Sequence, residues 1–264
     1  MAGQTIAYSV FTKPWKMPLP ELARLVSGLG FDGIELPVRP GFQVLPENVG
    51  RGLPKAVAVL ADYGLKVLSI AGPTDEETIA ACAESGVPII RIMISIDEDG
   101  YLATEARTLR RFDALVPLLE RYGVTIGVQN HCDRFVANAA GLRHLLGRYD
   151  RRHIAAVWDA AHEALNGQDP ELALEIVWDH LCMVNLKNAF WQRVNGPEAE
   201  YARWQVYWTS GRQGLASWPR VAAELKRRHY AGTLCLTAEY DDETAVERLI
   251  AEDIAFAKAL FQGD

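Results

Sequence analysis

The hydrophobic positions of the chain follow two periods in alternation from one end to the other. Short apolar, β-branched runs are typical of buried parallel strands. Each run is followed by a longer stretch whose apolar residues fall on one helical face, often ended by Gly or Pro. Eight such strand–helix units predict an α/β fold, a closed (β/α)8 barrel, as a single domain over residues 1–264.

The predicted strands share a β-branched centre, and they are 5–11, 33–38, 66–71, 89–96, 125–130, 154–159, 182–186 and 233–238. The predicted helices begin near Pro20, Leu53, Pro73, Thr104, Ala139, Glu171, Ser217 and Glu243. Residues 188–215 are rich in Trp, Tyr and Arg, and they predict a long functional loop over the barrel mouth. The alternative is an open doubly wound sheet, but the segment after the first strand has no glycine-rich phosphate loop.

One strand places a charge inside the predicted barrel. Isoleucines occupy every second position of 89–96, so Arg91 falls on the opposite, inward face. A buried guanidinium needs an anionic partner, and Glu35 on the second strand is the candidate. We expect this pair to lie well below the active site.

Four neighbouring strands end in polar side chains, and active sites of such barrels lie at these carboxyl ends. The predicted ring consists of Gln129, Asp159, Asn185 and Glu239, with His131, His162 and Lys187 just above it. All four ring residues offer oxygen atoms, which suit hard cations such as Mg²⁺, Mn²⁺ or Ca²⁺. The alternative is a hydrogen-bonded polar plug without a metal.

The composition of the chain excludes some classes of binding partner. The formal net charge is −7, which argues against nucleic acid as a partner. No apolar run is long enough for a membrane span, and no signal peptide is evident at the N-terminus. The four cysteines are scattered without metal-site spacing, which favours free thiols in a reducing cytoplasm. A small molecule is the expected partner, with a homo-oligomer as a further possibility.

Several short segments together resemble the xylose isomerase-like TIM barrels, the family of sugar phosphate isomerases and epimerases that includes D-tagatose 3-epimerase and inosose dehydratase. They are 31–36, 129–131, 159–162, 185–188 and Glu239. The resemblance implies a divalent metal, Mn²⁺ or Mg²⁺, and two glutamates that exchange a proton beside a carbonyl. By position, Asp159 and Glu239 match metal ligands. His162 matches a substrate-binding histidine, and Lys187 matches the lysine after the seventh strand.

Two positions depart from the family pattern. Gln129 stands where the family has Glu, and Asn185 stands where it has His. A glutamine cannot abstract a proton, and these neutral amides replace one carboxylate and the one nitrogen ligand. Metal binding is therefore expected to be weak or absent, and the two-glutamate mechanism does not carry over whole.

The sequence leaves three functions open. The first is a sugar or polyol isomerase or epimerase in which Glu239 is the base and His131 or Lys187 is the partner acid. The second is a dehydratase or lyase on a related compound. The third is a sugar-binding barrel that has lost catalysis. The candidate substrate contacts are His162, Trp191, Arg193 and Trp15.

Overall fold

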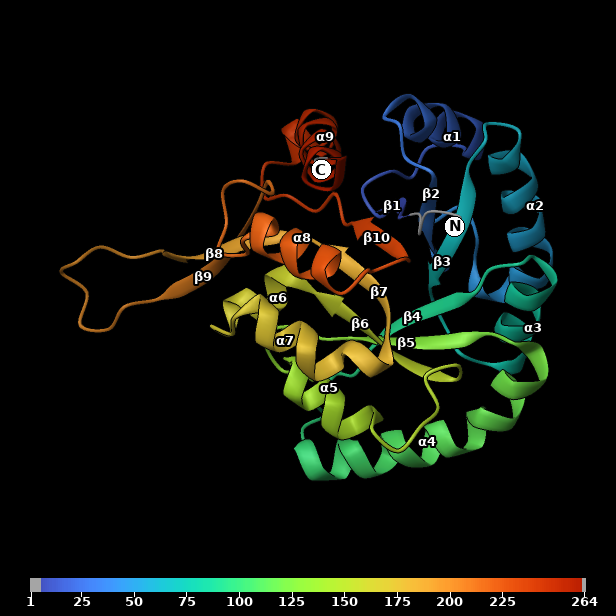
Figure 1. Cartoon of the computed structure of the whole chain (residues 1–264), viewed down its shortest axis with the longest axis horizontal. Coiled ribbons are helices and arrows are strands. Elements are labelled where there is room, and N and C mark those ends of the chain that lie inside the picture. Colours follow the sequence, from blue (N-terminus) through green and yellow to red (C-terminus); the bar gives the residue numbers. More distant parts are fainter. Residues whose placement is uncertain (1–5, 263–264) are drawn as a thin grey trace.

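Eight parallel strands close into a barrel in the computed structural model, which describes residues 6–262 (Figure 1). The barrel strands are β1 (Ala7–Phe11), β2 (Gly33–Pro37), β3 (Lys66–Ala71), β4 (Ile89–Met93), β5 (Thr125–Gln129), β6 (Ile154–Asp159), β7 (Leu181–Leu186) and β10 (Thr233–Leu236). Strand β1 pairs in parallel with both β2 and β10, which closes the ring. The predicted barrel is confirmed; Thr5, at the start of the first predicted strand, lies outside the described residues.

Helices follow the barrel strands and form the outer layer (Figure 1). The α-helices are α1 (Leu19–Gly28), α2 (Val49–Ala61), α3 (Glu76–Glu84), α4 (Tyr101–Tyr122), α5 (Ala139–Leu146), α6 (Ala160–Leu165), α7 (Pro170–Val177), α8 (Trp218–Arg227) and α9 (Val246–Gln262). The 3-10 turns are η1 (Pro46–Asn48), η2 (Trp178–His180) and η3 (Glu243–Ala245). Within residues 6–262, no helix is both long and apolar enough to cross a membrane.

Local capping bonds fix where several helices begin. The side chains of Asp75, Asn138 and Ser217 each accept a hydrogen bond from a backbone N–H in the first turn of the following helix. Such caps satisfy donors that have no partner inside the helix. These bonds fix the starts of α3, α5 and α8 relative to the loops before them.

The core has two parts. The larger part lies between the strands and the helices, and it contains large buried side chains such as Trp158, Trp218 and Phe112. A smaller apolar cluster packs along the inward-facing positions of the strands and comprises Phe11, Ala71, Ile89, Val157, Met183 and Cys235. The barrel is therefore filled by side chains, and polar groups gather toward its carboxyl-terminal mouth.

The predicted loop at 188–215 is largely a β-hairpin. Strands β8 (Asn188–Arg193) and β9 (Trp204–Thr209) pair in antiparallel register, and the ribbon projects away from the barrel (Figure 1). Ala189 lies opposite Trp208 at the inner end, and Arg193 lies opposite Trp204 at the outer end. Because side chains alternate along a strand, one face of the ribbon packs on α6 at the mouth of the barrel.

Candidate active site at the mouth of the barrel

A continuous chain of hydrogen bonds runs from inside the barrel to its mouth. Arg91 Nε donates to Glu35 Oε1 at 2.7 Å, and Arg91 Nη1 donates to Gln129 Oε1 at 2.5 Å. Gln129 Nε2 in turn donates to Asp159 Oδ2 at 2.8 Å. The predicted pair of Arg91 and Glu35 is confirmed. Its expected place well below the active site is wrong, because the long arginine side chain reaches the end of β5.

Asp159 also caps the short helix α6. Its Oδ1 accepts hydrogen bonds from the backbone N–H groups of Ala161 and His162, at 3.0 and 3.2 Å. The carboxyl group is fully buried, and burial raises its pKa to about 6, although the nearby Lys187 opposes this change. Both carboxylate oxygens of Asp159 therefore already have hydrogen-bond donors.

Glu239 lies between two lysines. Lys187 Nζ donates to Glu239 Oε2 at 2.8 Å, and Lys13 Nζ binds Oε1. Burial alone would raise the pKa of Glu239, but the two ammonium groups outweigh it and hold the pKa at about 2. Ala238, just before it, has a left-handed φ of 52° that turns the chain at the end of β10. Glu239 is therefore an ionised side chain in a fixed ion-pair cluster.

Two neutral imidazoles stack beside this cluster. The rings of His131 and His162 have centroids 3.9 Å apart. His131 Nδ1 lies 2.8 Å from the carbonyl oxygen of Cys132, which can only accept, so this nitrogen carries the proton and Nε2 keeps a free lone pair. His162 Nδ1 accepts the N–H of Cys132, so its own proton is on Nε2. Burial lowers the pKa of both histidines, most strongly for His162.

Trp208 joins the lysine to the histidines. Lys187 Nζ lies 3.6 Å from the centroid of the Trp208 ring, a cation–π contact. The same ring meets the edge of His162 at a centroid distance of 5.1 Å. The inner end of the hairpin thus forms one wall of the candidate site.

The remaining predicted substrate contacts have other partners. Trp191 donates its indole N–H to the carbonyl of Leu165, and Arg193 donates to the carbonyl of Gly196 near the outer end of the hairpin. Trp15 is buried in the core. Trp191 is thus bonded to α6, Arg193 is bonded within the hairpin, and Trp15 packs in the core, rather than against Glu239 or Lys187.

Glu163, which the sequence did not single out, supports the site from below. Its carboxylate accepts hydrogen bonds from the backbone N–H of Ala139, the amide of Asn130 and the indole of Trp158. Burial raises the pKa of Glu163 to about 7. Asn130 also bonds the backbone of Asp159 in both directions, so Glu163 helps to fix the strand ends that carry Gln129 and Asp159.

The predicted metal ligands do not fit a divalent ion in this arrangement. Both oxygens of Asp159 accept hydrogen bonds, and both oxygens of Glu239 bind lysines. Gln129 is held by Arg91, and of these four predicted ligands only Asn185 has buried side-chain atoms without a hydrogen bond. Glu239 is therefore already neutralised by two ammonium groups, and each oxygen of Asp159 already has a hydrogen-bond donor. An added cation at Glu239 would lie beside both lysines.

A different trio of candidate ligand atoms comes together. Within residues 6–262, His131, Cys132 and His162 form the only group of three whose ligand atoms all lie within 4.8 Å of one another. All four cysteines are free, and burial raises the pKa of the Cys132 thiol to about 12. A protonated thiol is a poor ligand, so the trio offers two nitrogen donors rather than a complete site.

Residues 23–260 match the family described as xylose isomerase-like TIM barrel, and the chain belongs to this family. No curated protein matches the chain. The solved structures that resemble it include D-psicose 3-epimerase with D-tagatose from Clostridium cellulolyticum H10, at 12% identity and a TM-score of 0.72, covering 97% of this chain and 100% of that one.

Two further structures represent other reactions. The probable 3-DHS dehydratase AsbF from Bacillus anthracis has 15% identity and a TM-score of 0.75, covering 96% of this chain and 98% of that one. The 3-keto-D-glucoside 4-epimerase YcjR from E. coli has 13% identity and a TM-score of 0.71, covering 97% and 100%. At these identities the similarity shows a shared fold.

Proposed function

We propose that the chain is an enzyme that moves a proton on a carbon beside a carbonyl in a sugar, polyol or related hydroxy-carbonyl compound. The observation that carries the proposal is a row of contacts at the mouth of the barrel. It joins Glu239, Lys187, Trp208, His162 and His131. An anion, a cation, an aromatic face and two neutral imidazoles thus lie next to one another. Enolisation needs a base and a positive charge that stabilises the oxyanion, and these groups can supply both.

His131 is the base in this proposal. Its Nδ1 proton is bound to the Cys132 carbonyl, and its lowered pKa leaves Nε2 unprotonated at neutral pH. Nε2 therefore takes the proton from the carbon and returns it, to the same or to a neighbouring position. The base predicted from the sequence was Glu239, but a carboxylate with a pKa of about 2 is a weak base.

Lys187 and Lys13 stabilise the oxyanion that forms as the proton leaves. Their ammonium groups are fixed by Glu239, so little reorganisation is needed when charge develops on the substrate oxygen. Trp208 supplies a flat surface beside Lys187 on which the apolar face of a sugar can stack. Mn²⁺ or Mg²⁺ has no step in this proposal, because both oxygens of Glu239 bind lysines and both oxygens of Asp159 accept hydrogen bonds.

Two neighbouring functions share part of this site. Elimination begins with the same proton removal, and the fold similarity to a dehydratase supports keeping a dehydratase or lyase as the second candidate. The lysine-bound state of Glu239 favours the third candidate, a sugar-binding barrel without catalysis. The three candidate functions can be distinguished by the products that form and by whether the ligand exchanges a proton with the solvent.

The test is deuterium incorporation from solvent into a panel of ketoses, their phosphates and polyhydroxylated keto acids. We expect one class to exchange, and we expect His131→Gln to abolish that exchange while binding persists. His144→Gln is the matched control, because this histidine is exposed on α5 and pairs with Glu105. Loss of a hydroxyl from the product would indicate elimination. Binding without exchange would overturn the enzymatic proposal.

The metal content of protein purified without added metal should be measured together with this assay. We expect exchange to survive treatment with a chelator. If the chelator abolishes exchange and Mn²⁺ restores it, the lysine-based stabilisation is wrong.

A further inference from the structure

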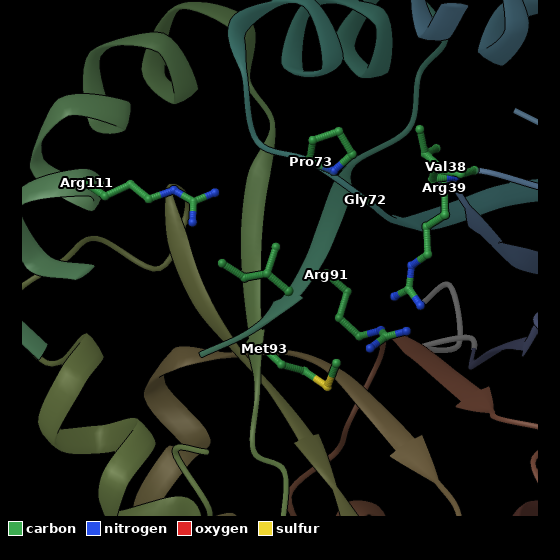
Figure 2. A pocket seen from close by; sticks show the side chains of 9 residues that line it. Val38, Arg39, Gly72, Pro73, Arg91, Met93 and Arg111 are labelled. Carbon is green, nitrogen blue, oxygen red and sulfur yellow. The ribbon is translucent and has the colours of Figure 1, made fainter. Parts of the chain in front are cut away.

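A hollow opens beside the mouth of the barrel, where β2, β3 and β4 end. Its volume is about 300 Å³, and its walls are the turns after β2 and β3, the end of β4 and one side chain from α4. Three arginines line it: Arg39 after β2, Arg91 from β4 and Arg111 from α4. Figure 2 shows the guanidinium groups of Arg39 and Arg91 near one another and Arg111 reaching toward the same space from α4.

The three arginines do not have three acidic partners. Arg91 is paired with Glu35. Within the described part of the chain, the half-buried Arg39 side chain makes no hydrogen bond or ion pair, although it lies 5.8 Å from the centre of the Phe11 ring. Among residues 6–262, Arg111 donates only to the hydroxyl of Thr74. Two guanidinium groups at this hollow therefore lack a neutralising carboxylate.

The concentration of positive charge is unfavourable without a ligand. Burial and repulsion from Arg91 both lower the pKa of Arg39, while Glu35 and Glu239 act in the opposite direction. A guanidinium remains protonated in proteins all the same. A bound anion would remove this repulsion and would accept paired N–H bonds, the geometry in which arginine binds carboxylate or phosphate.

We propose that this hollow binds a carboxylate or phosphate group carried by the substrate. The assignment of the anion to the substrate rests on the proposed function. The hollow adjoins the mouth of the barrel, since Met93 in its wall pairs in register with Gln129, and Glu239 lies close enough to act electrostatically on Arg39 and Arg91. Arg91 also donates directly to Gln129, which bonds Asp159. One molecule thus places its anionic end among the arginines and its carbonyl end near Lys187.

The test compares ligands with and without a single anionic group. D-fructose 6-phosphate is paired with D-fructose, and D-gluconate is paired with D-sorbitol, each titrated calorimetrically into the full chain. Arg39→Gln and Arg111→Gln are the test variants, and Arg110→Gln is the control, because Arg110 is exposed on α4 and does not line the hollow. Inorganic phosphate is titrated as a minimal probe.

We expect the wild type to bind at least one anionic member at least about tenfold more tightly than its neutral partner, equivalent to about 1.4 kcal/mol. Each test variant should lose that preference, the control should keep it, and added salt should weaken it. Whether the wild type prefers the phosphate ester or the carboxylate identifies the anionic group that the hollow binds. Unchanged melting temperatures show that the variants fold.

Two results would overturn the proposal. One is equal affinity for charged and neutral partners, or no anion binding in the wild type. The other is an anion preference that survives both substitutions. Solvent exchange on a ketose in a wild type that shows no preference for anionic ligands would leave the proposed function standing and remove the anion site. Anion binding at the arginines without exchange on any compound would do the reverse.

Discussion

The side-chain amide of Gln129 donates to Asp159 Oδ2 at 2.8 Å while it accepts a hydrogen bond from Arg91. Only a group with one donor and one acceptor can bridge a guanidinium and a carboxylate in this way. A glutamate at this position would accept from Arg91 but repel an ionised Asp159. The departure from the family pattern at this position thus matches its neighbours in the barrel.

Restoring the family residues should create affinity for a cation. Gln129→Glu places a second carboxylate against Asp159, and Asn185→His adds a nitrogen donor where two amide atoms are now without hydrogen bonds. We expect the double variant to bind Mn²⁺ at least about tenfold more tightly than the wild type, by calorimetric titration. Gln129→Met with Asn185→His is the control without added charge. Equal affinity in all three proteins would show that these positions do not converge on one ion.

Removing Arg91 should destabilise the barrel. Arg91→Met leaves Glu35 buried and unpaired and removes the donor to Gln129, and breaking such a buried pair costs about 3–5 kcal/mol. The measurement is the free energy of unfolding in urea. Arg107→Met, which breaks exposed ion pairs to Asp97 and Asp99, should change it little. If the Arg91→Met variant unfolded in urea with the same free energy as the wild type, the buried pair would have no structural role.

The two tryptophans of β9 should behave differently. Trp208→Leu removes the ring that contacts Lys187 and His162, and we expect it to slow solvent exchange on the substrate at least about tenfold. Trp204→Leu is the matched control at the exposed outer end of the same strand, and it should leave the exchange rate unchanged. Equal rates in the two variants would mean that the hairpin does not form a wall of the site.

Asp253 should give stability a defined pH dependence. Its buried carboxyl accepts bonds from Gly211 N–H and the Tyr240 hydroxyl, and burial raises its pKa from 3.8 to about 6. Between those values the folded state holds a proton that the unfolded state has lost, so this group's contribution to stability falls as pH rises from about 4 to 6. The full difference corresponds to about 3 kcal/mol.

Asp253→Asn removes this titration and keeps both partners, since the amide can donate to the Tyr240 hydroxyl. Urea unfolding of wild type and variant at several pH values gives the difference in stability between them. We expect the wild type to lose stability relative to the variant as pH rises from 4 to 6, and no further change above that range. Glu252→Gln, at an exposed neighbouring position, should show no such trend. A constant difference for Asp253→Asn would contradict the raised pKa.

Periodicity was sufficient to predict the barrel. The predicted strands 66–71 and 154–159 coincide with β3 and β6, because a buried β-branched run has sharp edges where polar or glycine residues begin. The hairpin was not predicted, since ten residues separate β8 from β9 without the short Gly-containing turn that marks a tight hairpin. Helix α6 was missed because it starts directly at the end of β6, with no intervening turn.

The sequence allowed us to predict which side chains lie at the mouth of the barrel, but not which of them contact one another. Glu239, Lys187, His131 and His162 follow from strand ends, and the structure connects them through Trp208. Which groups pair depends on side-chain reach between elements distant in sequence. Lys13, 226 residues away from its partner Glu239, gave no local signal, and it changes the assignment of the base.

Strand β8 begins at Asn188, one residue after Lys187, and the Trp208 of its partner strand lies over that lysine. The projecting ribbon is therefore continuous in backbone with the lysine at the charged centre of the mouth. Tyr201 and Trp204 are exposed at its outer end, and a contact there would reach Lys187 only by moving this shared backbone. Were the two ends coupled in this way, the coupling would be reciprocal, and a ligand at the mouth would alter affinity at the far end of the ribbon by the same factor.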